Sequence, residues 1–471
     1  MKPAISPTPA AMPRVGELLD VTVTDWGDQG RGIARHGNLV VLTNRGLPGE
    51  TVRVRVTRRR RRHLEADLES VLVPSPHRVA APCRHFGACG GCRLQDLDYP
   101  EQLAGKVRHL RDQVQRIGRI EQIPEIEVVP CDSPYRYRNK MEFSFGLGRD
   151  GAPTLGLHPR DNYRDSFDLE ECWLTDERAV EIVAAVRSFL ASGPEAVYDP
   201  VAHAGFLRFL VVRFGFRTGD VLVNLVTADV PWPRSEEFAT HLQGSCPYVT
   251  TALWTVNATR ANVAIGPVRE VFFGPGTLRE RLGPWEFEIA AGGFFQTNTL
   301  QAERLFERVV GWTCPTPTPV LDLYSGAGAI SLCLSPRASH VTGVESHHDS
   351  VESARRNAER NRIANCEFVC ADTLQFLKEQ SLDRWRRGAV IVDPPRAGLH
   401  PKVVKILGET GPDRIVYVSC NTAAFARDLE MLGGRYRLTR LAAVDMFPHT
   451  PHIESAALLE RDSIPSSGVT P

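Results

Sequence analysis

The chain lacks a charge surplus, long apolar runs and a cysteine framework. It holds 56 Lys and Arg against 56 Asp and Glu residues, so its net charge predicts no polyanionic partner. No stretch is apolar enough to span a bilayer, and residues 1–14, with four prolines and three alanines, do not resemble a signal peptide. Eleven cysteines, an odd number, argue against disulfides and for free thiols, a metal site or a catalytic thiol. We expect a cytoplasmic protein with no membrane partner and no obligate protein partner.

The first seventy-odd residues read as a small barrel. With 471 residues and 42% hydrophobic content, the chain can form two or three domains, and disordered and fibrous classes are excluded. Short alternating strands punctuated by glycine are expected at 18–23, 32–35, 38–42, 51–57 and 64–72, a pattern typical of a β-barrel. Five consecutive arginines at 58–62 concentrate positive charge there, and either a nucleic-acid contact or a solvated loop would explain them.

The rest of the chain divides into a mixed region and an α/β region. Helical spacing at 102–119 and 176–191, among short strands, indicates a central α+β domain. A helix at 300–312 and buried-strand runs at 320–324, 341–344, 389–392 and 415–418 indicate a doubly wound α/β sheet. We expect domains at 14–74, 75–290 and 291–462, with disordered tails at 1–13 and 463–471.

A glycine loop follows the first strand of the α/β region. The sequence at the end of that strand, Tyr324-Ser-Gly-Ala-Gly, lets the backbone approach a ligand, and the next strand is followed by Glu345, whose carboxylate suits ribose hydroxyls. Position 331 is Ser, so the full dinucleotide fingerprint is absent. Asp372, after a third strand, is either a contact for an adenine amino group or a helix N-cap. Loop and carboxylate together predict a nucleoside cofactor.

Reactive side chains follow the last two predicted strands. Asp393, in Asp-Pro-Pro-Arg, and Cys420, in Ser-Cys-Asn, each end a buried strand and so lie at the cofactor edge of the sheet. A thiolate that adds to carbon 6 of uracil makes carbon 5 nucleophilic enough to take a methyl group. Glu454, with His449 and His452 nearby, could then remove the proton from carbon 5. A buried apolar Cys and a solvated Glu are the alternatives.

Four motifs in this order resemble the RNA uracil-5 methyltransferases: Phe-Phe-Gln-x-Asn at 294–298, Asp-Pro-Pro-Arg-x-Gly at 393–398, Ser-Cys-Asn at 419–421 and Phe-Pro-His-Thr-x-His-x-Glu-Ser at 447–455. The resemblance implies a Rossmann-like methyltransferase domain, Cys420 as nucleophile and Glu454 as proton acceptor. It further implies S-adenosyl-L-methionine as cofactor, with contacts from Gln296, Tyr324, Glu345, Asp393 and Asp372. One departure is Ala329, where close relatives carry Asn, which puts one cofactor hydrogen bond in doubt.

A cysteine cluster lies near the start of the central domain, which we expect to carry it. Cys83, Cys89 and Cys92 lie within ten residues, with paired glycines between the last two, a spacing that suits metal ligation. Spacing alone leaves zinc and iron-sulfur open, with reduced free thiols as a third possibility, and leaves Cys131 or Cys172 as the fourth ligand. The resemblance selects Cys172 and implies a 4Fe-4S cluster, because ribosomal-RNA members carry one on four such cysteines.

The barrel resembles a TRAM domain, an RNA-binding module found in the large-subunit ribosomal-RNA members of this family. Barrel and cluster together favour 23S rRNA as the RNA partner, with the target uridine turned out of its stack. The alternatives are the same chemistry on tRNA, a methyltransferase of another acceptor, and a non-catalytic RNA-binding relative.

Overall fold

The computed structural model describes residues 12–148, 151–162 and 164–462. They form two compact units: the first contains residues 12–82, 92–106 and 449–451, and the second contains 83–91, 107–448 and 452–462. Apart from residues 12 and 13, the predicted tails 1–13 and 463–471 lie outside the described residues. No helix in the described ranges is long and apolar enough to cross a membrane.

The first unit contains a closed five-stranded barrel with the order β1-β2-β3-β5-β4, which confirms the predicted small barrel. Alternate residues of β1 and β4 point inward, so that Val21, Val23, Val52 and Val54 are buried. Residues 58–62 are all exposed. The strands are β1 Leu18–Trp26, β2 Gly32–His36, β3 Leu39–Thr43, β4 Thr51–Arg59 and β5 His63–Val73.

In the second unit, a mixed seven-stranded sheet has the order β13-β12-β11-β10-β7-β8-β9. Every residue of β10 and β11 is buried, as expected for central strands. The strands are β7 Lys140–Leu147, β8 Pro153–Leu157, β9 Phe167–Asp168, β10 Leu207–Phe214, β11 Val221–Thr227, β12 Thr251–Val256 and β13 Val268–Phe273; the helices are α2 Arg178–Leu190 and α3 Ser235–Ser245. We refer to this sheet as the central sheet.

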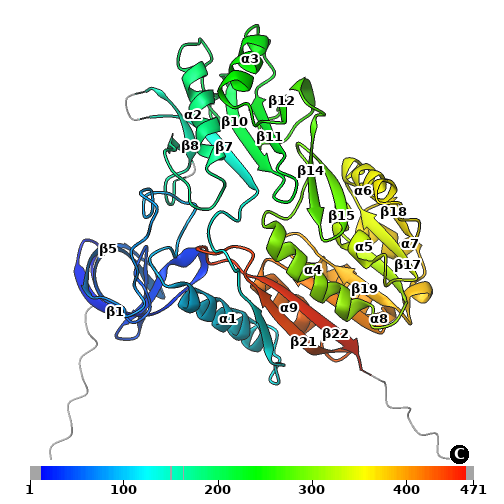
Figure 1. The fold of residues 1–471 in the computed structure, drawn as a ribbon. Helices are drawn as coiled ribbons and strands as arrows, with labels where there is room; N and C mark the ends of the chain where they lie inside the picture. Colours follow the sequence, from blue (N-terminus) through cyan, green and yellow to red (C-terminus); the bar gives the residue numbers. More distant parts are fainter. Residues whose placement is uncertain (1–11, 149–150, 163, 463–471) are drawn as a thin grey trace, which may run out of the picture. The chain divides into compact units, whose positions relative to one another are not determined.

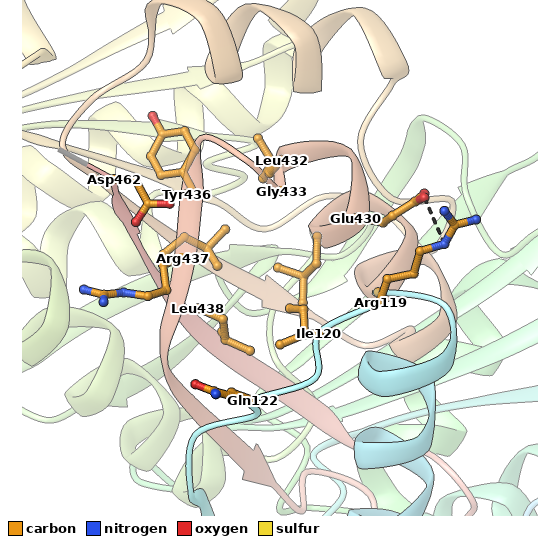
Figure 2. Close-up of a pocket in the computed structure, with 13 residues that line it drawn as sticks. Arg119, Ile120, Gln122, Glu430, Leu432, Gly433, Tyr436, Arg437, Leu438 and Asp462 are labelled. Atoms are coloured by element: carbon orange, nitrogen blue, oxygen red, sulfur yellow. Dashed lines mark ion pairs between the residues drawn. The ribbon is translucent and has the colours of Figure 1, made fainter. Parts of the chain in front are cut away.

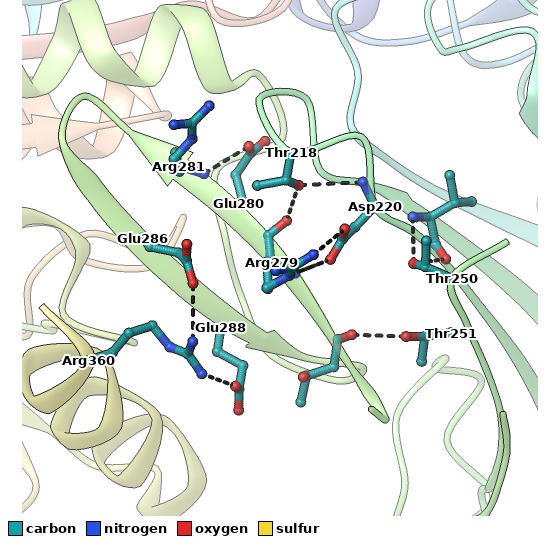
Figure 3. Close-up of polar contacts among 12 residues, drawn as sticks. Thr218, Asp220, Thr250, Thr251, Arg279, Glu280, Arg281, Glu286, Glu288 and Arg360 are labelled. Atoms are coloured by element: carbon teal, nitrogen blue, oxygen red, sulfur yellow. Dashed lines mark hydrogen bonds and ion pairs between the residues drawn. The ribbon is translucent and has the colours of Figure 1, made fainter. Parts of the chain in front are cut away.

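A two-stranded hairpin is formed by β14 Thr277–Leu282 and β15 Trp285–Ala290. Its side chains form ion pairs with two parts of the second unit. Figure 3 shows Arg279 of β14 paired with Asp220, at 3.1 Å, beside the central sheet. On β15, Glu286 pairs with Arg360, the last residue of helix α6 (His348–Arg360), at 3.1 Å. The hairpin therefore links the central sheet to the α/β region.

The α/β region is built on an eight-stranded sheet with the order β18-β17-β16-β19-β20-β22-β21-β6 (Figure 1). Strands β16 to β20 are parallel, which confirms the doubly wound fold, and the order reverses between β16 and β19. The strands are β6 Ile126–Val129, β16 Pro319–Leu323, β17 His340–Glu345, β18 Cys366–Cys370, β19 Ala389–Val392, β20 Arg414–Ser419, β21 Tyr436–Val444 and β22 Glu454–Arg461.

Helices cover both faces of this sheet with apolar side chains. One core layer includes Leu305, Ile330 and Val351 from α4, α5 and α6, and the other includes Leu110 from α1 together with residues of α7, α8 and α9. The helices are α1 Tyr99–Arg116, α4 Thr299–Thr313, α5 Ala329–Leu334, α6 His348–Arg360, α7 Thr373–Glu379, α8 Pro401–Thr410 and α9 Thr422–Leu432.

The predicted helix at 102–119 is displaced toward the N-terminus. It begins at Tyr99, because the Asp98 carboxylate accepts the Glu101 amide at 2.9 Å and so caps the first turn. It ends at Arg116, and Arg119 already has a left-handed backbone with φ of 53°.

Candidate active site

Backbone pairing brings Cys420 and Glu454 together. Strands β20 and β22 are antiparallel, with Ser419 opposite Ser455, so the residue after Ser419 lies beside the residue before Ser455, which places Cys420 beside Glu454. The Ser455 hydroxyl donates to the Ser419 carbonyl at 3.1 Å and reinforces this end of the pair. The predicted nucleophile and the predicted base therefore lie side by side at the carboxyl edge of the parallel strands.

The electrostatics of the pair favour protonated forms. Glu454 is 4% exposed, and burial, followed by the Asp393 charge, raises its pKa well above the usual value. Burial and then the nearby Glu454 raise the pKa of the half-buried Cys420 thiol. Arg396 opposes both effects with its positive charge and with a hydrogen bond to Cys420. The guanidinium is thus placed to favour the two anions that covalent chemistry needs.

Asp393 completes this group at the end of β19. Burial and the charge of Asp322 raise its pKa to about 7. The loop that carries Asp393 and Arg396 is tied to the cysteine loop, because the Asn421 side chain donates to the Arg396 carbonyl at 2.9 Å while capping α9. The two motifs therefore form one connected edge.

The loop after β16 has a left-handed backbone at several positions, a conformation that favours glycine. Gly326 and Gly328 have φ of 54° and 81°, and Tyr324 also has a positive φ of 65°. The Gly326 amide donates to the Glu345 carboxylate at 3.2 Å, so the end of β17 holds the loop in place. Burial acts to raise the pKa of Glu345, but hydrogen bonds from His347 and the Gly326 amide outweigh it and lower that pKa.

The remaining predicted cofactor residues surround the same edge. Asp372 caps α7 by accepting the Gln375 amide at 3.0 Å, as the N-cap alternative predicts, and its charge also raises the pKa of Tyr324 after the larger effect of burial. Gln296 is partly buried in the loop between β15 and α4. Ala329 is the first residue of α5 and offers no side-chain hydrogen bond.

Two buried oxygens indicate that this edge suits a polar ligand. Among the described residues, the second carboxylate oxygen of Asp322 and the Ser325 hydroxyl have no hydrogen-bond partner. Burying a polar atom without a hydrogen-bond partner costs free energy, and a ligand that bonds to these oxygens would offset that cost. A nucleoside with ribose hydroxyls and an amino group fits this set of carboxylates and hydroxyls.

Asp322 should make stability depend on pH. Burial raises its pKa from 3.8 to about 7, so the folded state binds this proton more tightly than the unfolded state, and the resulting stability is lost as pH rises through 7. We expect the wild type to lose about 1 kcal/mol more than Asp322→Asn between roughly pH 6 and 8. Thermal melting across that range checks this, and parallel curves for the two proteins would contradict it.

The cysteines of the predicted cluster are divided between the two units. Cys83, Cys89 and Cys172 belong to the second unit, where burial, and then the Cys172 and Glu171 charges, raise the pKa of Cys83. Cys92 belongs to the first unit, where the Gln95 amide donates to its sulfur at 3.1 Å. Within the part of the chain that the structure describes, no group of three or more His, Cys, Asp or Glu side chains is arranged to hold a metal ion.

Cys131, the other possible fourth ligand, has a different environment. It is 6% exposed, its thiol donates to the Ser133 carbonyl at 3.1 Å, and the Asn298 amide reaches its sulfur at 3.8 Å. Burial raises the pKa of this thiol. These contacts lie at the N-terminus of α4 and give Cys131 a packing role there.

Sequence reasoning assigned no role to Arg396, although the residue stands in a motif it had identified. His452 lies near this arginine, at 3.5 Å from its guanidinium. His449 instead faces the Gln102 amide in the first unit, at 3.1 Å. A cavity of about 340 Å³ lies near Arg119 and Tyr436, and none of the predicted site residues lines it (Figure 2).

Replacement of Arg396 should shift the pH dependence of activity. Because its charge lowers the pKa of both Cys420 and Glu454, Arg396→Gln should raise both pKa values and move the rising limb of kcat/KM to higher pH. Activity should fall near neutral pH and recover in part in alkaline solution. Arg384→Gln, at an exposed ion pair with Glu367, is the matched control. An unshifted profile would show that Arg396 does not tune these groups.

Comparisons with known proteins agree with this geometry. A family model described as tRNA (Uracil-5-)-methyltransferase matches residues 283–462, and a TRAM domain model matches residues 14–68. An uncharacterized RNA methyltransferase of Nitratidesulfovibrio vulgaris is 38% identical over 95% of this chain and 97% of its own, and one of Geobacter sulfurreducens is 36% identical over 94% and 90%.

A solved structure matches nearly the whole chain. The tRNA (uracil-54, C5)-methyltransferase of Pyrococcus abyssi, in complex with S-adenosyl-L-homocysteine, aligns with a TM-score of 0.74 and 32% identity over 93% of this chain and 99% of its own. Sequence and fold therefore agree across both the barrel and the α/β region. The chain belongs to the family of S-adenosylmethionine-dependent RNA uracil-5 methyltransferases.

Proposed function

We propose that this enzyme methylates carbon 5 of a uridine in 23S rRNA through a covalent adduct with Cys420. The observation that carries the proposal is the pairing of β20 with β22, which sets the thiol beside the Glu454 carboxyl at the cofactor edge. A thiol and a buried carboxyl with a raised pKa are the nucleophile and the proton acceptor that this chemistry requires.

The steps follow from the side chains. The Cys420 thiolate adds to carbon 6 of the uracil, and the electron pair of the carbon 5 to carbon 6 double bond moves into an enolate. When bound, S-adenosylmethionine would supply the methyl group for carbon 5, and its sulfonium sulfur would keep the bonding pair. Glu454 then removes the proton from carbon 5, and the sulfur to carbon 6 bond breaks to release Cys420.

We assign the cofactor contacts to Gln296, Tyr324, Glu345, Asp372 and Asp393. Four of these residues lie at or just after the carboxyl ends of β16, β17, β18 and β19, and Gln296 lies in the loop before α4. The carboxyl edge of such a sheet is where ligands bind, which supports the assignment. The Glu345 carboxylate, kept ionised by its hydrogen bonds, suits ribose hydroxyls.

We also propose a 4Fe-4S cluster on Cys83, Cys89, Cys92 and Cys172, held apart from the methyl-transfer chemistry. The ligand set rests on spacing and family resemblance, and the burial of Cys89, Cys92 and Cys172 is compatible with it. Anaerobic purification followed by iron and sulfide assays should give stoichiometric iron and sulfide; zinc without sulfide would contradict the cluster.

The RNA partner has two candidates. The arginines at 58–62 are exposed on the barrel, and their positive charge suits an RNA backbone. We assign the barrel domain to residues 14–74, the central domain to residues 75–290 and the catalytic domain to residues 291–462. The Pyrococcus abyssi relative is named as a tRNA methyltransferase, and it aligns with 93% of this chain, a share that includes part of the barrel. We therefore take tRNA as the second candidate.

Methylation of purified RNA separates the two candidates. We expect the enzyme with S-adenosylmethionine to form 5-methyluridine in 23S rRNA prepared from a strain that lacks the gene, and to leave tRNA from the same strain unmodified. Nuclease mapping and mass spectrometry locate the product. Methylation confined to tRNA would establish the second candidate, and failure to bind S-adenosylmethionine would favour a non-catalytic relative.

A further inference from the structure

Side chains of the central sheet hold the backbone of the loop that carries Gln296. Asn139, directly before β7, donates from its side chain to the Gln296 carbonyl at 3.0 Å and from its backbone to the Thr297 carbonyl at 2.9 Å. Its own carbonyl accepts the Phe214 amide at 2.8 Å, so it is anchored to β10. Asn139 is 8% exposed. One buried residue thus fixes two successive peptide groups of the loop.

A buried arginine holds the start of the same loop. Arg213 of β10 is 2% exposed and donates to the Gly293 carbonyl. Burial lowers the pKa of Arg213 to about 10, so it remains charged at neutral pH. Together, Asn139 and Arg213 bind three backbone carbonyls within five residues.

Behind Asn139, a buried carboxylate completes the arrangement. The Asn139 amide also donates to the Thr299 hydroxyl at 2.9 Å, and that hydroxyl donates to Glu280 at 2.7 Å. Glu280, which is 0% exposed, accepts the backbone amides of Phe216 and Arg217 at 2.7 and 2.8 Å. Figure 3 shows Glu280 on the hairpin that links the two parts of the unit.

These bonds end on the backbone of the loop and leave the Gln296 side chain to meet a ligand. The neutral hydrogen bonds that Asn139 donates each contribute modestly to stability, but removing the partner of a buried polar group costs more free energy. Because the donors lie at the ends of β7 and β10, the position of Gln296 depends on a sheet that contributes none of the proposed cofactor contacts.

We propose that Asn139, supported by Thr299 and Glu280, is a positioning residue that sets the affinity for S-adenosylmethionine through the Gln296 loop. The proposal rests on the cofactor contacts assigned under the proposed function. It makes cofactor binding depend on the central sheet, which forms no part of the doubly wound methyltransferase sheet.

The test measures cofactor affinity apart from stability. Asn139→Asp keeps the shape of the side chain but removes the donor, and should weaken S-adenosylmethionine and S-adenosylhomocysteine binding about tenfold by calorimetry, with a matching rise in KM and a smaller change in kcat. Thr299→Val should weaken binding in the same sense, whereas Thr299→Ser, which keeps the hydroxyl, should restore it.

Asn224→Ala is the matched control, because Asn224 is a buried amide of the same sheet, 1% exposed, on β11. It should lower the melting temperature and leave cofactor affinity unchanged. Unchanged affinity in Asn139→Asp, or equal losses in Asn224→Ala and Asn139→Asp, would overturn the proposal.

Gln296→Ala separates this proposal from the assignment on which it rests. If that variant binds the cofactor normally while Asn139→Asp does not, the loop is positioned for another contact and only the Gln296 assignment fails. If Gln296→Ala weakens binding and Asn139→Asp does not, the positioning role fails alone. A wild-type protein that binds no cofactor would overturn the proposed function and, with it, the positioning role.

Discussion

Cys420→Ala should lose methylation activity by at least about a thousandfold, because it removes the thiol that lies beside Glu454 and that we propose adds to carbon 6 of the uracil. The variant should also form no denaturation-resistant adduct with RNA that contains 5-fluorouridine at the target position, since fluorine blocks the final elimination in an active enzyme. Product formation is measured by transfer of labelled methyl groups, and the adduct by a shifted band on a denaturing gel.

The control for this experiment is Cys370→Ala, which removes an exposed thiol at the end of β18. It should retain activity and adduct formation. Full activity in Cys420→Ala, with an unchanged melting temperature, would refute the covalent mechanism. An inactive variant that still bound RNA and S-adenosylmethionine as tightly as the wild type would place the defect at the chemical step.

Glu454→Gln should separate methyl transfer from product release. Glutamine has the size of glutamate but accepts no proton, so carbon 5 should be methylated while the adduct fails to eliminate. Turnover should fall by about a hundredfold to ten-thousandfold. With ordinary uridine RNA and labelled S-adenosylmethionine, the label should accumulate in a protein–RNA complex.

Glu460→Gln, on the same strand and partly exposed, is the matched control and should turn over normally. Normal turnover in Glu454→Gln would exclude Glu454 as the proton acceptor. Complete loss of the complex would mean that the carboxyl acts before methyl transfer, for example by assisting formation of the Cys420 thiolate.

Local patterns predicted most of the elements that carry the site. The strands ending before Asp393 and Cys420 were expected at 389–392 and 415–418, and the structure has them at Ala389–Val392 and Arg414–Ser419. Buried parallel strands are continuous apolar runs, and such runs are visible without knowledge of their partners. The edge on which both residues lie follows from strand direction alone.

Pairing order could not be read in this way. No local signal indicated that β22 enters between β20 and β21, or that β6, almost two hundred residues earlier than β16, extends the same sheet. Register between distant strands depends on tertiary packing rather than on period. The proximity of Cys420 to Glu454 therefore came from family resemblance at the sequence level and from backbone pairing in the structure.

The contacts of single polar residues were the least predictable. The sequence places His449 and His452 close to Glu454 along the chain, but it does not reveal that His449 bonds Gln102 within the first unit or that His452 lies near Arg396 within the second. Asn139 belongs to none of the identified motifs, so the sequence did not predict its contacts with the Gln296 loop. Hydrogen bonds between residues more than a hundred positions apart leave no spacing that a sequence could reveal.

The place of β22 has a consequence for how the protein acquires activity during synthesis. This strand is the last to leave the ribosome among the described strands, yet it occupies an interior position of the sheet and begins with Glu454. Earlier parts of the chain can fold as they emerge, but the sheet must keep a place open between β20 and β21. A nascent chain therefore has the proposed nucleophile, Cys420, before it has the proposed base, Glu454, and we expect it to become competent for turnover only when that final strand is inserted.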